Sequence, residues 1–373
     1  MRAPRVLAML LAAALGAGCR RPEPIRIGFV AGLSGRHYDL GVACRNGAQL
    51  AAEDVNAAGG IGGRPVELLV RDDAQDAETA RRAVRELIDA GAVAIVGHCT
   101  SAMAQATLPI ANEARVLMIS PTVSSGALLG KDDWLVLADA SGTTTAAGLA
   151  VYFARTRERH AVTVVLDASN RAYADPWRAT FTATLDARGG RVVRVVEFTS
   201  GQVASYAELA RQALADAPDA VLIIANALDT AVLAQHLRKR TPGPAADEVQ
   251  LLGTGWSFTD DLVRHGGSAV ERVLFVHKVN PDDTRPPATR FRTIYSERFG
   301  TAPVFAAIEA YDSVQLLAAG LDRDPTREGV RREILRQGTF RGLTEEFTID
   351  RFGDAHRRNH ISTVREGRFL LVE

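Results

Sequence analysis

The chain has 373 residues, of which 47% are hydrophobic and 24% are charged, and its 44 Lys and Arg residues balance its 44 Asp and Glu residues. This length and apolar content indicate two or three globular domains and exclude an intrinsically disordered chain. The zero formal net charge argues against a nucleic-acid-binding protein, and three cysteines are too few for a disulfide-stabilised small fold.

The N-terminus has the features of an export signal. Positive charge precedes an unbroken apolar run at 6–17, which as a helix would span about 18 Å and is too short to cross a bilayer. We therefore predict a signal peptide at 1–18 and a polar tether at 19–24. Cys19 follows small residues, as in a bacterial lipobox, although Gly16 stands where the motif has a large aliphatic residue. Lipidation of Cys19 is the prediction, and ordinary cleavage nearby is the alternative.

Short apolar runs alternate with helical patterns along the rest of the chain. We expect strands at 25–30, 66–70, 92–96, 116–119, 162–166, 191–197, 220–224 and 249–252, and helices at 41–58, 76–90, 102–114, 176–188, 206–215 and 229–240. The helix at 76–90 has Asp76 as its expected N-cap. This alternation predicts two α/β lobes, each with a parallel sheet covered by helices.

Three of the expected strands end in small hydroxyl-bearing turns, at 34–35, 97–101 and 120–125. Ligands of open parallel sheets bind beyond the carboxyl ends of the strands. Two of these turns lead into helices, whose free N–H groups favour an anion such as a carboxylate. Each turn alone is also explained by N-capping, but three from neighbouring strands indicate a ligand site.

Other motifs do not support catalysis, a metal or a cofactor. The Gly-Ile-Gly at 60–62 follows a helix and precedes a strand, the reverse of the dinucleotide-binding order. The acidic pair at 72–73 could bind Mg²⁺ or cap a turn. His356 and His360 have helical spacing but lack further ligands nearby. Since the sequence shows no set of nucleophile, base and acid, we predict a protein that is not an enzyme.

A series of motifs resembles the leucine/isoleucine/valine-binding protein family. They lie at 27–35, 52–63, 70–73, 95–98, 118–121, 310–313, 339–344, 347–350 and 353–354. The matches run in order across nearly the whole chain after the signal peptide. The resemblance implies a type I periplasmic-binding-protein fold, with two Rossmann-like α/β lobes and parallel sheets joined by three crossover strands. Family members close around an amino acid or related small molecule and deliver it to an ABC importer.

The resemblance also implies lobe boundaries and partners. Crossovers are expected near 136–140, 277–280 and 348–352, with lobe one at 25–138 and 281–348 and lobe two at 139–280 and 349–373. The expected partners are a small-molecule ligand, the permease subunits of an ABC transporter, and the membrane through the lipid anchor. We expect a periplasmic or cell-surface location and no nucleic acid partner.

The family's ligand residues carry over position by position. Ser101 matches the Ser that faces the ligand carboxylate, and Thr122 and Ser124 match the small and hydroxyl residues after the Ser-Pro turn. Tyr173 matches the Tyr that closes over the ligand from lobe two, although a lone loop Tyr can simply pack.

Two departures from the family concern the ligand. The acid that pairs with the ligand ammonium is expected at 253–256, where this chain has no Asp or Glu. A second aromatic residue is replaced by Asn226 or Ala227. Because a buried, unpaired ammonium is costly, either another carboxylate supplies the charge or the ligand is not an α-amino acid. Trp256 could then stack on a planar ligand or pack against its own lobe.

The first turn and the cysteines leave further alternatives open. Tyr38, with Arg36 and His37, is a candidate lining residue of lobe one, and Arg36 could face either a ligand carboxylate or solvent. Cys44 and Cys99 could approach each other, but the sequence leaves open whether they form a disulfide.

Three functions are compatible with these features. The first is a solute-binding protein of an ABC importer, and the second is a ligand sensor that signals to a membrane kinase. Nothing in the chain separates these two. A secreted enzyme, the third, would need a nucleophile and a base within reach. Small-ligand binding rests on the strand-end chemistry, whereas the transport role rests on the resemblance.

Overall fold

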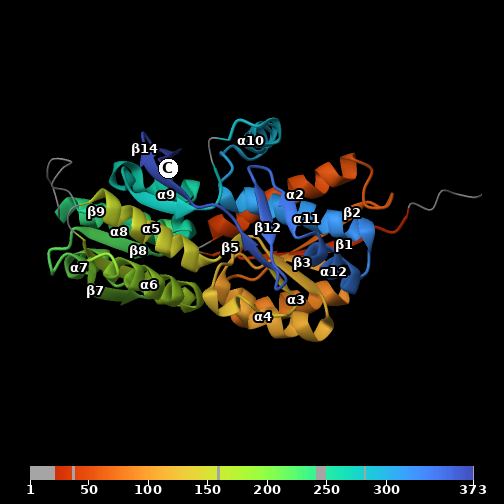
Figure 1. Cartoon of the computed structure of the whole chain (residues 1–373), viewed down its shortest axis with the longest axis horizontal. Helices are drawn as coiled ribbons and strands as arrows, with labels where there is room; N and C mark the ends of the chain where they lie inside the picture. The colour runs from red at the N-terminus through yellow and green to blue at the C-terminus, as the bar shows by residue number, and fades with distance from the viewer. Residues whose placement is uncertain (1–21, 36–37, 158–159, 241–248, 281–282, 373) are drawn as a thin grey trace, which may run out of the picture.

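The computed structural model describes residues 22–35, 38–157, 160–240, 249–280 and 283–372, which form two α/β lobes side by side (Figure 1). The strand order of the first sheet is β11-β12-β13-β5-β4-β3-β1-β2, and that of the second is β15-β14-β10-β9-β8-β6-β7. The first sheet contains β1 (Ile25–Ala31), β2 (Val66–Asp72), β3 (Ala94–Gly97), β4 (Leu117–Ser120), β5 (Leu135–Ala140), β11 (Thr339–Arg341), β12 (Glu346–Ile349) and β13 (Asp354–His356). The second contains β6 (Ala161–Asp167), β7 (Arg191–Phe198), β8 (Ala220–Ile224), β9 (Gln250–Gly253), β10 (Leu274–His277), β14 (His360–Arg365) and β15 (Arg368–Leu371).

Helices cover both sheets (Figure 1). Those of the first lobe are α2 (Tyr38–Ala57), α3 (Ala77–Asp89), α4 (Ser101–Ala114), α10 (Pro286–Phe299), α11 (Phe305–Arg323) and α12 (Arg327–Gln337). Those of the second lobe are α5 (Gly142–Thr156), α6 (Arg171–Asp186), α7 (Tyr206–Ala213), α8 (Ala227–Arg240) and α9 (Asp260–Gly266). Short 3₁₀ turns lie at η1 (Gly126–Leu128), η2 (Ala168–Asn170), η3 (Gly255–Ser257) and η4 (Gly267–Val270). Within the part of the chain that the structure describes, no helix combines the length and apolar character needed to span a bilayer.

The prediction of two α/β lobes is confirmed, but each sheet is mixed. Strands β1 to β5 pair in parallel, as do β6 to β10. The C-terminal strands add antiparallel pairs, β11 with β12 and β12 with β13 in the first sheet, and β10 with β14 and β14 with β15 in the second. Short hairpin connections can join only antiparallel strands, so each parallel sheet has an antiparallel edge.

Side chains on the central strands alternate between the two helix layers. Val136 and Ala138 of β5 belong to the core that includes residues of α2 and α11, whereas Leu135 and Leu137 belong to the core formed with α3 and α4. Successive side chains of a strand point to opposite faces of the sheet, and burial on both faces explains the continuous apolar runs of the sequence. This double packing fixes the strand ends that carry the candidate site.

The chain passes between the lobes after β5, between β10 and α10, and between β13 and β14. The resemblance places the third passage near 348–352, with lobe two resuming at 349. Sheet pairing contradicts that boundary, because β13 pairs with β12 and β5 in the first sheet. Asp350 accepts hydrogen bonds from the N–H groups of Phe352 and Asp354, at 2.8 and 3.1 Å, and so closes the turn that returns the chain to this sheet.

Helix α6 begins at Arg171, before the predicted start at 176. Proline is typical of the first turn of a helix, where an N–H group is not needed, and Pro176 therefore predicts a start at this position. Inside α6, Pro176 has no N–H to donate to the carbonyl of Ala172. In the structure the Ser125 hydroxyl, from the first lobe, donates to that carbonyl. A contact between lobes therefore satisfies the carbonyl that the proline leaves free.

Candidate functional site

A cavity lies between the lobes at the carboxyl ends of β3, β4 and β5. It contains about 350 Å³ of empty space, part of which is open to solvent. Its lining residues are Leu40, Cys99, Thr100, Ser101, Thr122, Ser124, Asp139, Asn170, Tyr173, Gly255, Trp256 and Phe305. Both lobes contribute, so a molecule bound here would touch both.

Ser101 occupies the position expected of an anion-binding residue. It is the first residue of α4 and is buried, and among the described residues its hydroxyl makes no hydrogen bond. The N–H groups of a first helical turn have no partner within the helix and favour an anion. The N–H of Ala102, in the same turn, donates a hydrogen bond at 3.1 Å to Oδ1 of Asn170, which belongs to the other lobe.

Thr122 and Ser124 follow β4 and also line the cavity. The Thr122 hydroxyl donates to the carbonyl oxygen of Cys99 at 2.8 Å, so it joins the loops after β3 and β4. The carbonyl of Ser124 accepts the N–H of Gly142 at 2.7 Å, at the start of α5 in the second lobe. The Thr122 hydroxyl is therefore already bonded within the first lobe, whereas the Ser101 hydroxyl has no hydrogen-bond partner in the described part of the chain.

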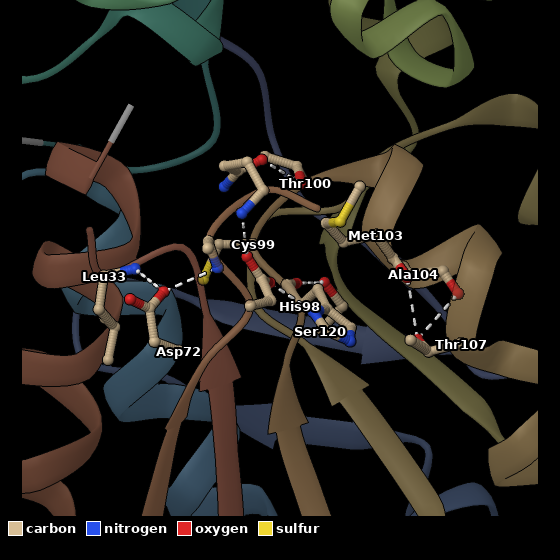
Figure 2. Close-up of polar contacts among 12 residues, drawn as sticks. Leu33, Asp72, His98, Cys99, Thr100, Met103, Ala104, Thr107 and Ser120 are labelled. Atoms are coloured by element: carbon tan, nitrogen blue, oxygen red, sulfur yellow. Dashed lines mark hydrogen bonds and ion pairs between the residues drawn. The ribbon is translucent and has the colours of Figure 1, made fainter. Parts of the chain in front are cut away.

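A buried polar network supports these loops from below (Figure 2). The Ser120 hydroxyl donates to the carbonyl of His98 at 2.6 Å, and the His98 Nδ1 lies 2.6 Å from Asp73 Oδ2. Asp72 accepts the N–H of Leu33 at 2.8 Å. The acidic pair at 72–73 thus caps turns, and within the described ranges no group of three or more His, Cys, Asp or Glu side chains is placed to hold a metal ion.

Two aromatic rings from the second lobe form the opposite wall. The rings of Tyr173 and Trp256 meet edge to face, with centroids 5.9 Å apart and planes at 80°. Trp256 is 8% exposed and Tyr173 is partly buried. Burial raises the pKa of Tyr173 above its ordinary value, and the charge on Asp139 adds to this effect, so the phenol stays neutral.

Two of the predicted lining residues lie outside this cavity. Asn226 is buried at the start of α8, where its Oδ1 accepts the N–H of Asp229 at 3.0 Å and its Nδ2 donates to the Asp229 carboxylate at 2.6 Å. Tyr38 is 40% exposed and lines a neighbouring surface pocket. Residues 36–37 and Cys19 fall outside the described residues.

The sequence analysis missed four important lining residues. Asp139 ends β5, and the same strand-end rule that identified Ser101 would have included it. Asn170 lies three residues before Tyr173, within η2. Leu40 and Phe305 come from the first turns of α2 and α11, and no local pattern distinguishes them from ordinary core residues.

Cys44 and Cys99 are buried and carry free thiols. Burial raises the pKa of the Cys44 thiol well above its ordinary value, and the neighbouring Cys99 thiol adds to this. The two cysteines therefore lie side by side without forming a disulfide, and Cys99 lines the cavity.

Direct contacts hold the lobes together around the cavity. Besides the bond between Asn170 and Ala102, the Thr259 hydroxyl donates to the Asp39 carboxylate at 2.6 Å. Each of these hydrogen bonds joins one lobe to the other, so both favour the arrangement in which the lobes lie close together over the cavity.

Replacing Asn170 with Ala should open the ligand-free protein. The change removes the interlobe hydrogen bond to Ala102, worth about 1 kcal/mol, so the ratio of open to closed molecules should rise roughly fivefold. Small-angle X-ray scattering would show a larger radius of gyration. Asn170→Asp, which retains an acceptor oxygen, is the control, and an unchanged radius for Asn170→Ala would contradict a closing role for this bond.

Comparisons with known proteins agree with this architecture. A family model described as periplasmic binding protein matches residues 24–367. The Leu/Ile/Val-binding protein BraC3 of Rhizobium johnstonii is 26% identical over 332 residues, covering 87% of this chain and 86% of that protein. The branched-chain amino acid transporter substrate-binding protein LivJ of Streptococcus pneumoniae, in complex with isoleucine, has a TM-score of 0.84 at 21% identity, over 94% of this chain and 99% of that one. A solute-binding protein of an ABC transporter from Rhodopseudomonas palustris, in complex with 3,4-dihydroxybenzoic acid, has a TM-score of 0.83 at 19% identity, over 93% and 95%.

Proposed function

Since the chain belongs to the periplasmic binding protein family, we propose that it captures a small carboxylate ligand between its lobes and delivers it to an ABC importer. The observation that carries this proposal is the interlobe cavity, because its walls come from both lobes and closure would enclose a ligand. An amino acid is the first candidate ligand, and an aromatic or amide analogue is the alternative.

The chemistry of the first lobe supports a carboxylate. The Ser101 hydroxyl at the start of α4 can donate to an anion without adding a fixed charge to the site. Isoleucine and 3,4-dihydroxybenzoic acid, the ligands of the two similar structures, both contain a carboxyl group. Tyr173 and Trp256 then provide an apolar wall for the remainder of the ligand.

A thermal-shift screen of the protein without residues 1–18 would test this function. The panel would contain amino acids, aromatic acids, amides and short dicarboxylates. A ligand that binds only the folded state adds about 2.7 kcal/mol of stability at a hundredfold excess over its Kd, which raises the melting temperature measurably. A panel in which no carboxylate stabilises the protein would contradict the proposal. Uptake of the identified ligand by membranes that carry the cognate permease would separate an importer component from a sensor.

We further propose that the chain is exported and anchored through a lipid on Cys19. The signal-like segment at 1–18 and the small residues before Cys19 support this location. Cys19→Ser should abolish the lipid modification and move the protein from the membrane fraction to the released fraction. Cys44→Ser is the matched control, because Cys44 is buried within the first lobe. Retention of Cys19→Ser in the membrane fraction after a salt wash would rule out the anchor.

A further inference from the structure

Two cysteine side chains from separate elements meet inside the first lobe. Cys44 lies on α2, and Cys99 lies in the turn between β3 and α4 (Figure 2). The two thiols are in hydrogen-bond contact, and the exposed fractions of the two residues are 0% and 3%. A disulfide can form only between cysteines that the fold already brings together, so this contact is the geometry that such a bond requires.

Other contacts hold the same two elements together. The Thr122 hydroxyl donates to the carbonyl oxygen of Cys99 at 2.8 Å, and the Cys44 side chain is also hydrogen-bonded to the Thr122 side chain. Leu40 lies one turn before Cys44 on the same face of α2, and it lines the cavity together with Cys99. The start of α2 is therefore packed against the turn after β3, and the contact between the thiols follows from this packing.

The cysteine content of the chain makes this meeting informative. The chain has three cysteines, and Cys19 is the predicted site of the lipid. The other two, on different elements, are the two that touch. A buried cysteine can serve simply as a small apolar residue, but two thiols in contact within an exported protein meet an oxidising environment. Such a pair is expected to be oxidised.

We propose that Cys44 and Cys99 form a disulfide bond in the exported protein, and that this bond ties α2 to the turn that leads into Ser101 at the cavity. The inference rests on the export proposed above. It assigns a covalent modification to the wall of the cavity in the first lobe, which holds Leu40 and Ser101 on its two sides.

Thiol–disulfide exchange with a protein disulfide of the oxidising compartment supplies the chemistry. The thiolate of one cysteine attacks the oxidant disulfide, which forms a mixed disulfide and releases the first thiol of the oxidant. The other cysteine then attacks the mixed disulfide and releases the second thiol. Two protons and two electrons thus pass from the cysteines to the oxidant, which becomes a dithiol.

The burial of Cys44 indicates when the bond forms. Burial raises the pKa of the Cys44 thiol well above its ordinary value, and a protonated thiol is a poor nucleophile. The folded, reduced protein is therefore expected to oxidise slowly. We expect the bond to form while the exported chain folds, before α2 closes over Cys44.

Peptide mapping of the full chain, isolated from the exported fraction, would test the bond. N-ethylmaleimide added to intact cells blocks free thiols and prevents oxidation after lysis. Trypsin then places Cys44 in the peptide 37–45 and Cys99 in the peptide 86–115. Without reduction, mass spectrometry should find these two peptides linked and lighter by two hydrogen atoms than their sum.

The exported Cys44→Ala variant is the control for the mapping, and its peptide 86–115 should carry the maleimide. Exported wild-type protein in which both peptides carry the maleimide would overturn the inference and leave the proposed ligand binding and export intact. Linkage of either peptide to Cys19 would overturn it as well. A chain that stays in the cytoplasm would contradict the proposed export and this inference together.

Thermal unfolding with and without a reductant would test whether the bond braces the lobe. Reduction should lower the melting temperature of the exported wild-type protein by about 5 °C or more, because the bond restricts the unfolded chain between Cys44 and Cys99. Cys44→Ala cannot form the bond, so a reductant should leave its melting temperature unchanged. An equal decrease in both proteins, or no decrease in the wild-type protein, would contradict the bracing role.

Discussion

Replacing Arg357 with Met is expected to lower the free energy of unfolding by about 3–5 kcal/mol. The Arg357 guanidinium lies 3.1 Å from the Asp312 carboxylate, and the exposed fractions of the two side chains are 0% and 2%. Its Nε donates to the carbonyl of Ala138 at 2.8 Å, and its centre lies 3.7 Å from the centroid of the Phe347 ring. Removal of the cation would leave a buried carboxylate unpaired, and this accounts for most of the expected loss.

Urea denaturation of the variant would measure this effect. Arg358→Met is the matched control, because the same substitution at the next, exposed residue should change the unfolding free energy by less than about 0.5 kcal/mol. Adding Asp312→Asn to Arg357→Met should recover part of the stability, since the unpaired charge is then removed. A loss below about 1 kcal/mol for Arg357→Met would show that the buried pair is not a major stabilising contact.

The position of Arg357 links this stability to function. It lies in the third passage between the lobes, and through its partners it connects that passage to α11 and to β5. Asp139, which lines the cavity, follows Ala138 directly on β5. The contacts of Arg357 therefore hold both the third passage and the end of β5 at the cavity. Loss of the ion pair between Arg357 and Asp312 should disturb the movement of the lobes and the position of the bound ligand.

Local patterns were sufficient to predict most of the central fold. The helix expected at 76–90 is α3, and its predicted N-cap is confirmed, because Asp76 Oδ1 accepts the N–H of Thr79 at 2.8 Å. The C-terminal pairing was not predictable in the same way. Strand β13 joins the first sheet through partners distant in sequence, and α6 extends before Pro176 because Ser125 of the other lobe satisfies a backbone carbonyl. Such long-range contacts leave no periodic signal in the sequence.

The candidate site was predicted more completely for its donors than for its acid. Ser101, Thr122, Ser124, Tyr173 and Trp256 all line the cavity, and their contact with a ligand remains a prediction. Asn226 does not line it, because its side chain caps α8 through Asp229. Asp139 on β5 was not predicted, because the resemblance implies an acid at 253–256, although the rule for strand ends applies equally to β5.

Substitution of both Ser101 and Thr122 with Ala is expected to weaken ligand binding ten- to hundredfold while leaving the protein folded. Hydrogen bonds to a charged carboxylate contribute about 1.5–3 kcal/mol, and each 1.4 kcal/mol corresponds to a tenfold change in Kd. Ser101→Ala alone should account for most of the loss, since the Thr122 hydroxyl donates to the Cys99 carbonyl. Titration of both single variants and the double variant with the ligand from the thermal-shift panel would measure how much affinity each hydroxyl contributes.

Ser205→Ala is the matched control for this series. Ser205 caps α7 by accepting the N–H of Glu208 at 3.2 Å and lies outside the cavity lining, so its replacement should cost about 1 kcal/mol of stability without changing affinity. A larger loss for Thr122→Ala than for Ser101→Ala would mean that the Thr122 hydroxyl turns from Cys99 to the ligand on binding. Unchanged affinity in the double variant would remove both residues from the carboxylate site, and the remaining donors would then be the backbone N–H groups at the start of α4.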